Sequence, residues 1–351
     1  MIQERFKPSA VMAASRDIVA RGAGVATSTP HPIAAEGVSL AELAIACGRE
    51  ANPHRSDWHS LQAMAAGIST STFPRLLAEG LQALVSRTFT AQAQHMRFAT
   101  IVPLNKLGTP VDLLGFIDPV VELLPVNELG LIQSFLGPAP ARGVPSVRLS
   151  TYGRIVKVTR EAIINDDLRS IANFLANLGA SGARTEAVHV AQALESNPTM
   201  DDGTPLFDEL LNNVVPSLAL DDGSLSHAMA KLRKQRLPNG SLSDLAARHL
   251  VVCASMEWTA RRLVKDAGLD LEIHPMAYLP DGRWYLLADQ EIQPTVGVLR
   301  LGGAKDPTRT EQAPKHALKG FDGTGVRVMV DTGATLLSGV GIVRGGSVLE
   351  E

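Results

Sequence analysis

One segment limits more than any other how this chain of 351 residues can fold: a proline- and glycine-rich break over residues 137–143. Apolar pieces flank it, at 129–136 before and 144–149 after, which predicts a long two-stranded excursion. An isolated two-stranded ribbon is marginally stable in water and buries little within its own subunit. The sequence therefore predicts a chain that completes its packing on another surface.

Composition narrows the class of protein. Hydrophobic residues make up 45% of the chain and charged residues 20%, which allows a sizeable core and suits a subunit covered largely by neighbours. The net charge of −3 gives no basic excess of the kind that marks a nucleic-acid reader. We see neither a signal peptide nor an apolar run of membrane-spanning length, and expect synthesis in the cytoplasm. Cys47 and Cys253 are predicted to be buried free thiols.

Three helices are predicted from capping residues and apolar periodicity. Ser39, with Glu42 three residues on, begins a helix over 39–50. Apolar residues at spacings of three and four predict a second helix over 73–92. The Asn-Asp-Asp run just before Leu168 offers N-cap oxygens to a third, long helix over about 166–195.

The rest of the chain is predicted to contain shorter elements, among them helices at about 206–211, 223–236 and 255–267. Residues 1–37, rich in small residues and proline, predict a flexible arm with at most one short helix, and residues 52–72 are polar and broken. Short strands are expected at 154–158, 249–253, 284–288, 295–301 and 326–330. Helices and strands without regular alternation favour an α+β fold.

The motif that argues best for an enzyme is Asp331-Thr332-Gly333, which looks like the active-site turn of retropepsin-type aspartic proteases. Such a protease needs two carboxylates around one proton, and a flap and a second core strand after the aspartate. Only 20 residues follow Asp331. We therefore interpret Asp331 as structural, in a turn that follows the strand over 326–330 and donates backbone N–H groups to its carboxylate.

Other candidate motifs have simpler explanations. Two Asp-Asp-Gly sequences, at 201–203 and 221–223, lack the remaining ligands of a calcium loop and suit turns. The basic run over 231–236 suits the C-terminal end of a helix. The histidines show no metal-ligand spacing, and His189 is interpreted as an ordinary helix residue. We expect no catalytic, cofactor-binding or metal-binding residue and no cofactor.

The segment from Ser150 to Leu168, with the sequence STYGRIVKVTREAIINDDL, is similar to a known protein family. This stretch strongly resembles the Mu-like major head subunits of tailed phages, in which a Tyr-Gly-Arg strand leads through a turn into a long spine helix. Further pieces match in the family's order: residues 69–77, 200–207, 228–235, 249–253, 283–289 and 330–334. The resemblance covers about residues 39–340, with little match over 110–148.

The family implies the Hong Kong 97-type capsid fold and a division of the chain. An N-terminal arm would span 1–115 and an extended E-loop 116–153. A peripheral domain with the spine helix would span 154–239 and an axial domain 240–318, before the chain returns to the peripheral domain over 319–351.

The function that the resemblance implies is that of a major capsid protein, not an enzyme, which assembles with itself into pentamers and hexamers of an icosahedral shell around packaged DNA. Expected partners are a portal, a prohead protease or scaffold, and a cementing protein, with non-specific DNA contact and no membrane. The expected location is the virion capsid. An encapsulin-like cargo shell and the aspartic protease are the alternatives. The assembly contacts predicted in the arm and E-loop are Phe73, Leu77, Leu131, Ile132, Phe135 and Arg142.

Overall fold

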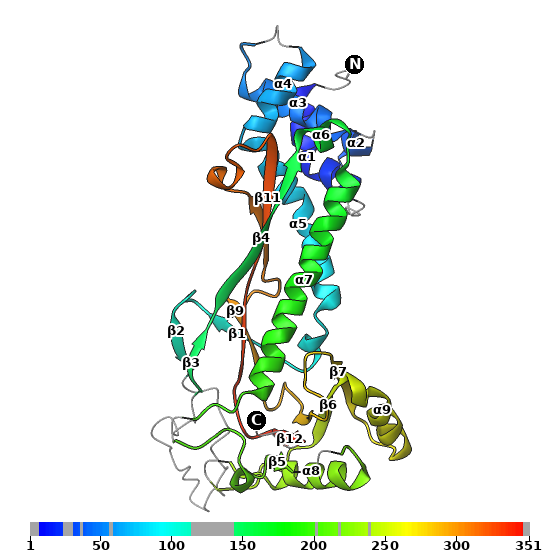
Figure 1. Cartoon of the computed structure of the whole chain (residues 1–351), viewed down its shortest axis with the longest axis vertical. Coiled ribbons are helices and arrows are strands. Elements are labelled where there is room, and N and C mark those ends of the chain that lie inside the picture. Colours follow the sequence, from blue (N-terminus) through cyan, green and yellow to red (C-terminus); the bar gives the residue numbers. More distant parts are fainter. Residues whose placement is uncertain are drawn as a thin grey trace, which may run out of the picture. The chain divides into compact units, whose positions relative to one another are not determined.

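The computed structural model describes residues 7–23, 31–35, 38–55, 59–113, 144–200, 203–216, 219–237 and 240–346 (Figure 1). The chain divides into two compact units, each made of three stretches of sequence. Unit 1 comprises residues 1–93, 151–185 and 306–331, and unit 2 comprises residues 94–150, 186–305 and 332–351. Two long elements, α7 (Leu168–Glu195) and β11 (Gly323–Leu336), contribute to both.

Unit 1 is a cluster of helices beside a small group of strands. Its helices are α1 (Pro8–Gly22), α2 (Pro32–Ala35), α3 (Leu40–Ala51), α4 (Ser60–Ser69), α5 (Thr72–Gln92), α6 (Arg160–Ile164) and the first part of α7. Its strands are β4 (Ser150–Thr159), β10 (Thr308–Gln312) and the first part of β11, to which both β4 and β10 pair. The predicted helices over 39–50 and 73–92 are α3 and α5, and Ser39 and Glu42 form the capping box of α3.

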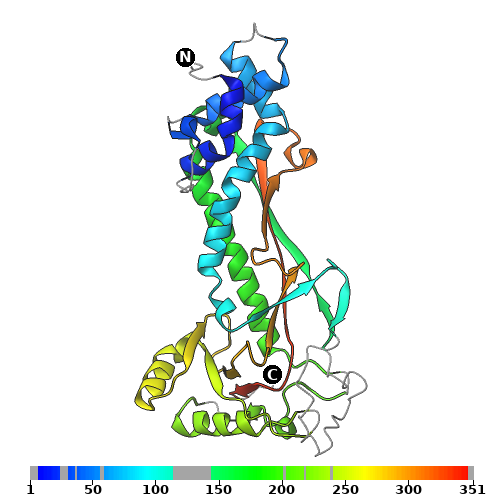
Figure 2. The ribbon, with the colours of Figure 1, turned by 180° about the vertical axis from the view of Figure 1, so that it is seen from behind.

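Glycines let the helices of unit 1 approach closely. A Cβ atom on Gly48 of α3 would lie 1.8 Å from the carbonyl oxygen of Ala63 in α4, and one on Gly67 of α4 equally close to that of Ala44. On α7, a Cβ atom at Gly179 would lie 2.5 Å from the carbonyl oxygen of Val85 in α5. The helices α5 and α7 accordingly run side by side (Figure 2).

Two predictions for unit 1 were wrong. Residues 1–37 contain the 15-residue helix α1, whose Val11, Ile18 and Val19 are buried in the core of the unit. The region over 52–72 contains α4. Asp166, from the run predicted to cap the long helix, adopts a left-handed conformation (φ 55°), and its carboxylate accepts the backbone N–H of Leu40 at 2.6 Å.

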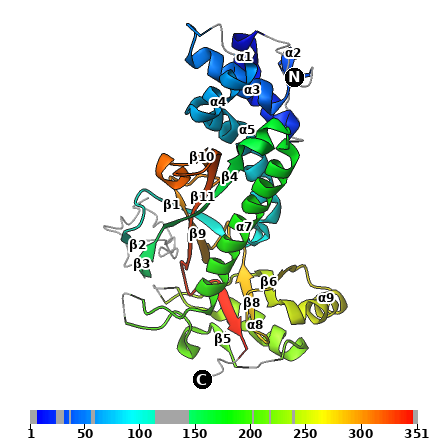
Figure 3. The same cartoon turned by 45° about the horizontal axis from the view of Figure 1, so that its top comes forward.

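Unit 2 is built on a five-stranded sheet with the strand order β5-β12-β8-β6-β7. The strands are β5 (Val214–Val215), β12 (Ile342–Gly345), β8 (Trp284–Ala288), β6 (Ala247–Cys253) and β7 (Glu272–Met276). One face packs on α8 (Asp222–Lys234) and α9 (Glu257–Asp266), which follows the short 3₁₀ turn η3 (Ala254–Met256) (Figure 3). The other face packs on the end of α7 and on β1 (Thr100–Leu104) and β9 (Val296–Leu301), which pairs with the last part of β11.

A two-stranded ribbon also belongs to unit 2. Its strands β2 (Pro110–Leu113) and β3 (Val144–Arg148) are antiparallel and enclose residues 114–143. The sequence predicted that residues 144–149 pair with residues 129–136, but residues 144–148 pair with β2, and residues 129–136 lie outside the described part of the chain. Shorter 3₁₀ turns, namely η1 (Gln94–Arg97), η2 (Glu209–Leu211) and η4 (Lys315–Leu318), complete the described elements. Helices and strands of this kind confirm the α+β class.

Candidate functional site

Asp331 lies inside β11, in unit 1, and not in a turn after a strand as the sequence predicted. Its side chain is 4% exposed, and one carboxylate oxygen lies 2.7 Å from Arg309 Nη2. The other accepts a hydrogen bond of 2.6 Å from the hydroxyl of Thr151 on β4. The carboxylate therefore joins β11 to its two neighbouring strands. Its partners are side chains on those strands rather than the predicted backbone N–H groups, and the arrangement supports a structural role.

A second carboxylate, Glu186, is fully buried inside unit 2. It accepts hydrogen bonds of 2.7 Å from Arg300 Nη2 and from the hydroxyl of Thr332, and lies 2.8 Å from His95 Nε2. Burial alone would raise the pKa of the Glu186 carboxyl, but the hydrogen bonds from His95 and Arg300 hold that pKa below its ordinary value. Glu186, on α7, is thus an ionised carboxylate inside the protein, with partners on η1, β9 and β11.

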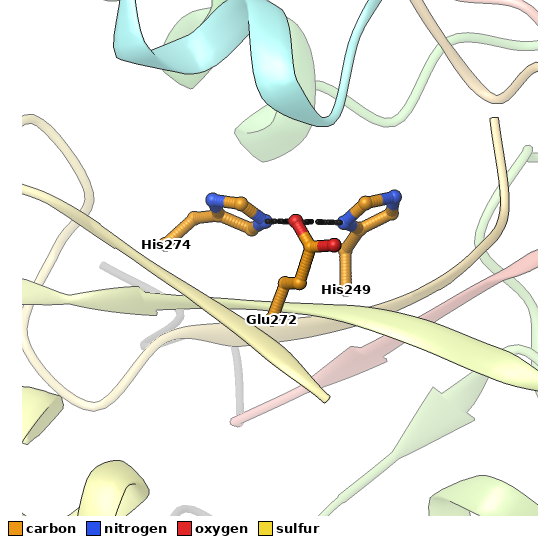
Figure 4. A group of neighbouring side chains, drawn as sticks. All are labelled: His249, Glu272 and His274. Atoms are coloured by element: carbon orange, nitrogen blue, oxygen red, sulfur yellow. Dashed lines mark hydrogen bonds and ion pairs between the residues drawn. The ribbon is translucent and has the colours of Figure 1, made fainter. Parts of the chain in front are cut away.

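A pair of histidines lies on one face of the unit 2 sheet. His249 of β6 stands opposite Glu272 of β7, and Val251 stands opposite His274, so the two rings and the carboxylate project from the same face (Figure 4). His249 Nδ1 is 3.1 Å from His274 Nε2. Glu272 Oε2 lies 3.8 Å from the first nitrogen and 3.9 Å from the second.

Both rings are buried and neutral at pH 7. Burial lowers the pKa of His249, and burial together with the repulsion that a protonated His249 would exert lowers the pKa of His274 to about 4. The sequence showed no metal-ligand spacing among the histidines, but the parallel register of β6 and β7 brings together two histidines that are 25 residues apart. The sequence did contain one indication of this site: Glu272 and His274 alternate along a strand, which places their side chains on the same face.

Several large apolar side chains of unit 2 are exposed. Trp258 on α9 is 77% exposed, Ile292 71% and Leu210 91%. On α9 the buried stripe is formed by Ala260 and Val264, at helical spacing. Trp258 precedes this stripe by two residues, which places it on the opposite side of the helix. None of these residues was predicted as a contact. The helical spacing of the apolar residues in α9 could have shown that Trp258 lies on the exposed side of that helix.

The predicted assembly contacts have different outcomes. Phe73 and Leu77 are fully buried in the core of unit 1, where they pack within their own chain. A neighbour could reach them only if these helices separated, so exposed side chains are the better candidates. The remaining predicted contacts lie outside the described residues, namely Leu131, Ile132, Phe135 and Arg142. Their assembly role stays a prediction.

The minor motifs have different outcomes: the Asp-Asp-Gly sequence at 221–223 begins α8 rather than forming a turn, whereas the basic run over 231–236 lies at the C-terminal end of α8, as predicted. Asp221 caps α8 and forms a capping box with Ser224, and the backbone N–H of Ser224 lowers the pKa of the Asp221 carboxyl. In the basic run over 231–236, Arg233 pairs with Asp244 at the surface. Both cysteines are buried free thiols, as predicted. The helices in the described part of the chain include none with the length and hydropathy of a membrane-spanning segment.

Comparison with known proteins gives the class. Residues 143–345, more than half of the chain, match the sequence model of the family described as phage capsid protein. The chain therefore belongs to the phage capsid protein family. The predictions of a tailed-phage major capsid protein, with a structural role in the virion, are confirmed at this level. A search of curated protein sequences found no match.

Solved structures of capsids and related shells resemble the chain weakly. A virus-like particle from Pyrococcus furiosus has a TM-score of 0.46 and 12% identity, over 76% of this chain and 97% of that chain. The capsid of cyanophage P-SCSP1u has a TM-score of 0.40 and 12% identity, over 71% of this chain and 86% of that chain. The SrpI encapsulin of Synechococcus elongatus has a TM-score of 0.46 and 11% identity, over 74% of this chain and 88% of that chain. At such values the family assignment rests on the sequence match.

Proposed function

We propose that the chain builds the phage head by associating through exposed apolar side chains of unit 2. The observation that carries this is the exposure of Trp258, Ile292 and Leu242, at 77%, 71% and 58%. All three lie within residues 240–318, which the resemblance assigns to an axial domain at the centre of each capsomer. Their burial between copies would favour closed rings of five and six.

Trp258 is the strongest single candidate for a contact of this kind. A tryptophan buries a large rigid surface at small entropic cost, and tryptophans dominate the binding energy of many interfaces. Its neighbours Arg261 and Arg262 on α9 are exposed cations, so the helix offers an apolar centre with a polar rim. That arrangement suits contact between copies of the same chain.

The E-loop proposal rests on the ribbon of β2 and β3. The two strands are antiparallel and lead into and out of residues 114–143, as the stem of an extended loop would. We assign to this loop a contact with the neighbouring subunit through Leu131, Ile132, Phe135 and Arg142. The strand that follows, β4, exposes most of its side chains, and among the described strands it pairs only with β11. An open strand edge favours association.

The shell is proposed to be held by non-covalent contacts. The fold's type member joins a loop lysine to a neighbour's asparagine, but here no lysine lies between Lys106 and Lys157 and no asparagine follows Asn239. A cementing protein is a proposed partner for this reason. A portal, and a prohead protease or scaffold, are proposed from the resemblance. Packaged DNA would meet the inner face without sequence readout; cargo protein in place of DNA would identify an encapsulin-like shell instead.

The test replaces Trp258 with serine in the full-length protein. We expect Trp258→Ser to retain the circular dichroism spectrum of the wild type and to form at least about tenfold fewer capsomers, because a buried aromatic anchor contributes about 2 kcal/mol or more. Lys265→Ser, at an exposed position of the same helix, should assemble normally. Normal assembly of Trp258→Ser by light scattering would remove α9 from the proposed interface.

A further inference from the structure

The three side chains His249, Glu272 and His274 offer the donor set of a transition-metal site. Two neutral imidazole nitrogens and one carboxylate are a ligand set that zinc uses in proteins. Metal–nitrogen bonds of about 2.0–2.1 Å in tetrahedral geometry separate two nitrogens by roughly 3.3 Å. The observed separation of His249 Nδ1 and His274 Nε2 is 3.1 Å, close to that value.

The carboxylate is oriented towards the same point. Arg248 Nη2 lies 2.8 Å from Glu272 Oε1, which leaves Oε2 as the oxygen that faces both imidazoles (Figure 4). Glu272 Oε2 must move inward by roughly half an ångström to reach a tetrahedral ligand separation. The side chain is 44% exposed, so it has room to move and gives an ion and a water ligand access from solvent.

The histidine rings are held by their surroundings. Both residues are buried, and the ring of Phe98 packs against that of His274 with the ring centres 5.1 Å apart. The charged groups that bear on the site are of both signs. Arg97 and Arg248 oppose a bound cation, whereas Asp289 and the carboxylate of Glu272 favour one. The site is therefore neither strongly acidic nor strongly basic.

We propose that His249, Glu272 and His274 bind a divalent transition metal of the zinc class, with water completing the coordination. The ion would replace the direct contact between the two imidazoles. Because β7 ends the strand order of the described sheet, the metal would tie this edge strand to β6. The role that follows is a structural clip that stabilises unit 2.

The test is metal binding by the full-length protein, which is first stripped with a chelator, then loaded with zinc and dialysed. We expect the wild type to retain about one zinc ion per chain, and cobalt in its place to give the visible absorption of a tetrahedral site. Glu272→Gln, at a partly exposed position, should fold normally and lower the affinity at least about tenfold. The double variant His249→Ala/His274→Ala should lose the site. The control His227→Ala, at an exposed histidine on α8, should bind as the wild type does.

A second measurement separates binding at this site from adventitious binding. Zinc should raise the unfolding temperature of the wild type and of His227→Ala, because a ligand of the folded state stabilises it, and should leave Glu272→Gln almost unchanged. Two results would overturn the proposal: no stoichiometric metal on the wild type, or equal binding by wild type and Glu272→Gln. Either would mean that the histidines only hydrogen-bond to each other.

Discussion

The interiors of the two units are stabilised in different ways. Unit 1 buries mainly apolar side chains, with Asp331 as its one buried charged residue among those described, and its helices meet at glycines. Unit 2 buries charged and amide groups throughout, among them Glu186, Arg300, Gln235 and Asn213. An apolar core tolerates the loss of one contact better than a buried ionic network, in which each partner satisfies another. Unit 2 should therefore be the more sensitive to single polar substitutions.

The largest effect is expected at Glu186. Replacing Glu186 with glutamine leaves the buried guanidinium of Arg300 without its counter-ion, which should lower the free energy of unfolding by ~3–5 kcal/mol. Urea unfolding of unassembled subunits would measure it. The control is Glu257→Gln on α9, whose pair with Arg261 is at the surface and should contribute little. If Glu186→Gln lowered the free energy of unfolding no more than Glu257→Gln does, the proposed difference between the two units would be wrong.

The same residue predicts a dependence on pH. Because the pKa of Glu186 is lower in the folded protein, its contribution to stability is complete above the ordinary glutamate pKa, near 4.3, and is lost as the pH falls through the folded value. The wild type should lose stability below about pH 4.3 more steeply than Glu186→Gln. Unfolding midpoints from pH 3 to pH 7 would measure this; identical slopes would contradict the assigned charge state.

An intermediate effect is expected from the helix contact of unit 1. Gly48→Ala introduces a methyl group 1.8 Å from the carbonyl oxygen of Ala63, so α3 and α4 must separate, at a cost of about 1–3 kcal/mol that exceeds the gain in helix propensity. Gly223→Ala on α8 is the matched control, because its Cβ atom would meet its nearest neighbour at 3.4 Å. Thermal unfolding should separate the two; equal midpoints would show that the helices are not in close contact.

The smallest effect is expected at Asp331. Asp331→Asn keeps a group that can accept the hydrogen bond of Thr151 and loses the ion pair with Arg309, which is 43% exposed, so the loss should be about 1 kcal/mol or less. The variant should assemble, as should the control Asp322→Asn at an exposed position. Peptide cleavage at acid pH by the wild type, lost in Asp331→Asn, would establish the protease alternative.

Local sequence patterns predicted those elements whose own residues specify them, by capping or by apolar periodicity. The capping box at Ser39 and the apolar stripe of α5 placed two helices to within one residue. The α1 helix was missed because its small residues suggest a flexible arm, whereas its stability comes from packing against residues distant in sequence, such as Val19 against Gly80. The histidine pair could not be predicted either, because it depends on the register between two strands that are distant in sequence. Strand β11 continues through Asp331, where a turn was predicted, because other strands pair with it on both sides.

Assembly is the property on which the whole account depends. The most direct measurement is the size of the purified full-length protein, by size exclusion with light scattering and by negative-stain electron microscopy. We predict capsomers or closed shells, since the chain belongs to the phage capsid protein family and exposes Trp258, Ile292 and Leu210. A folded protein that stays monomeric at high concentration would contradict the account.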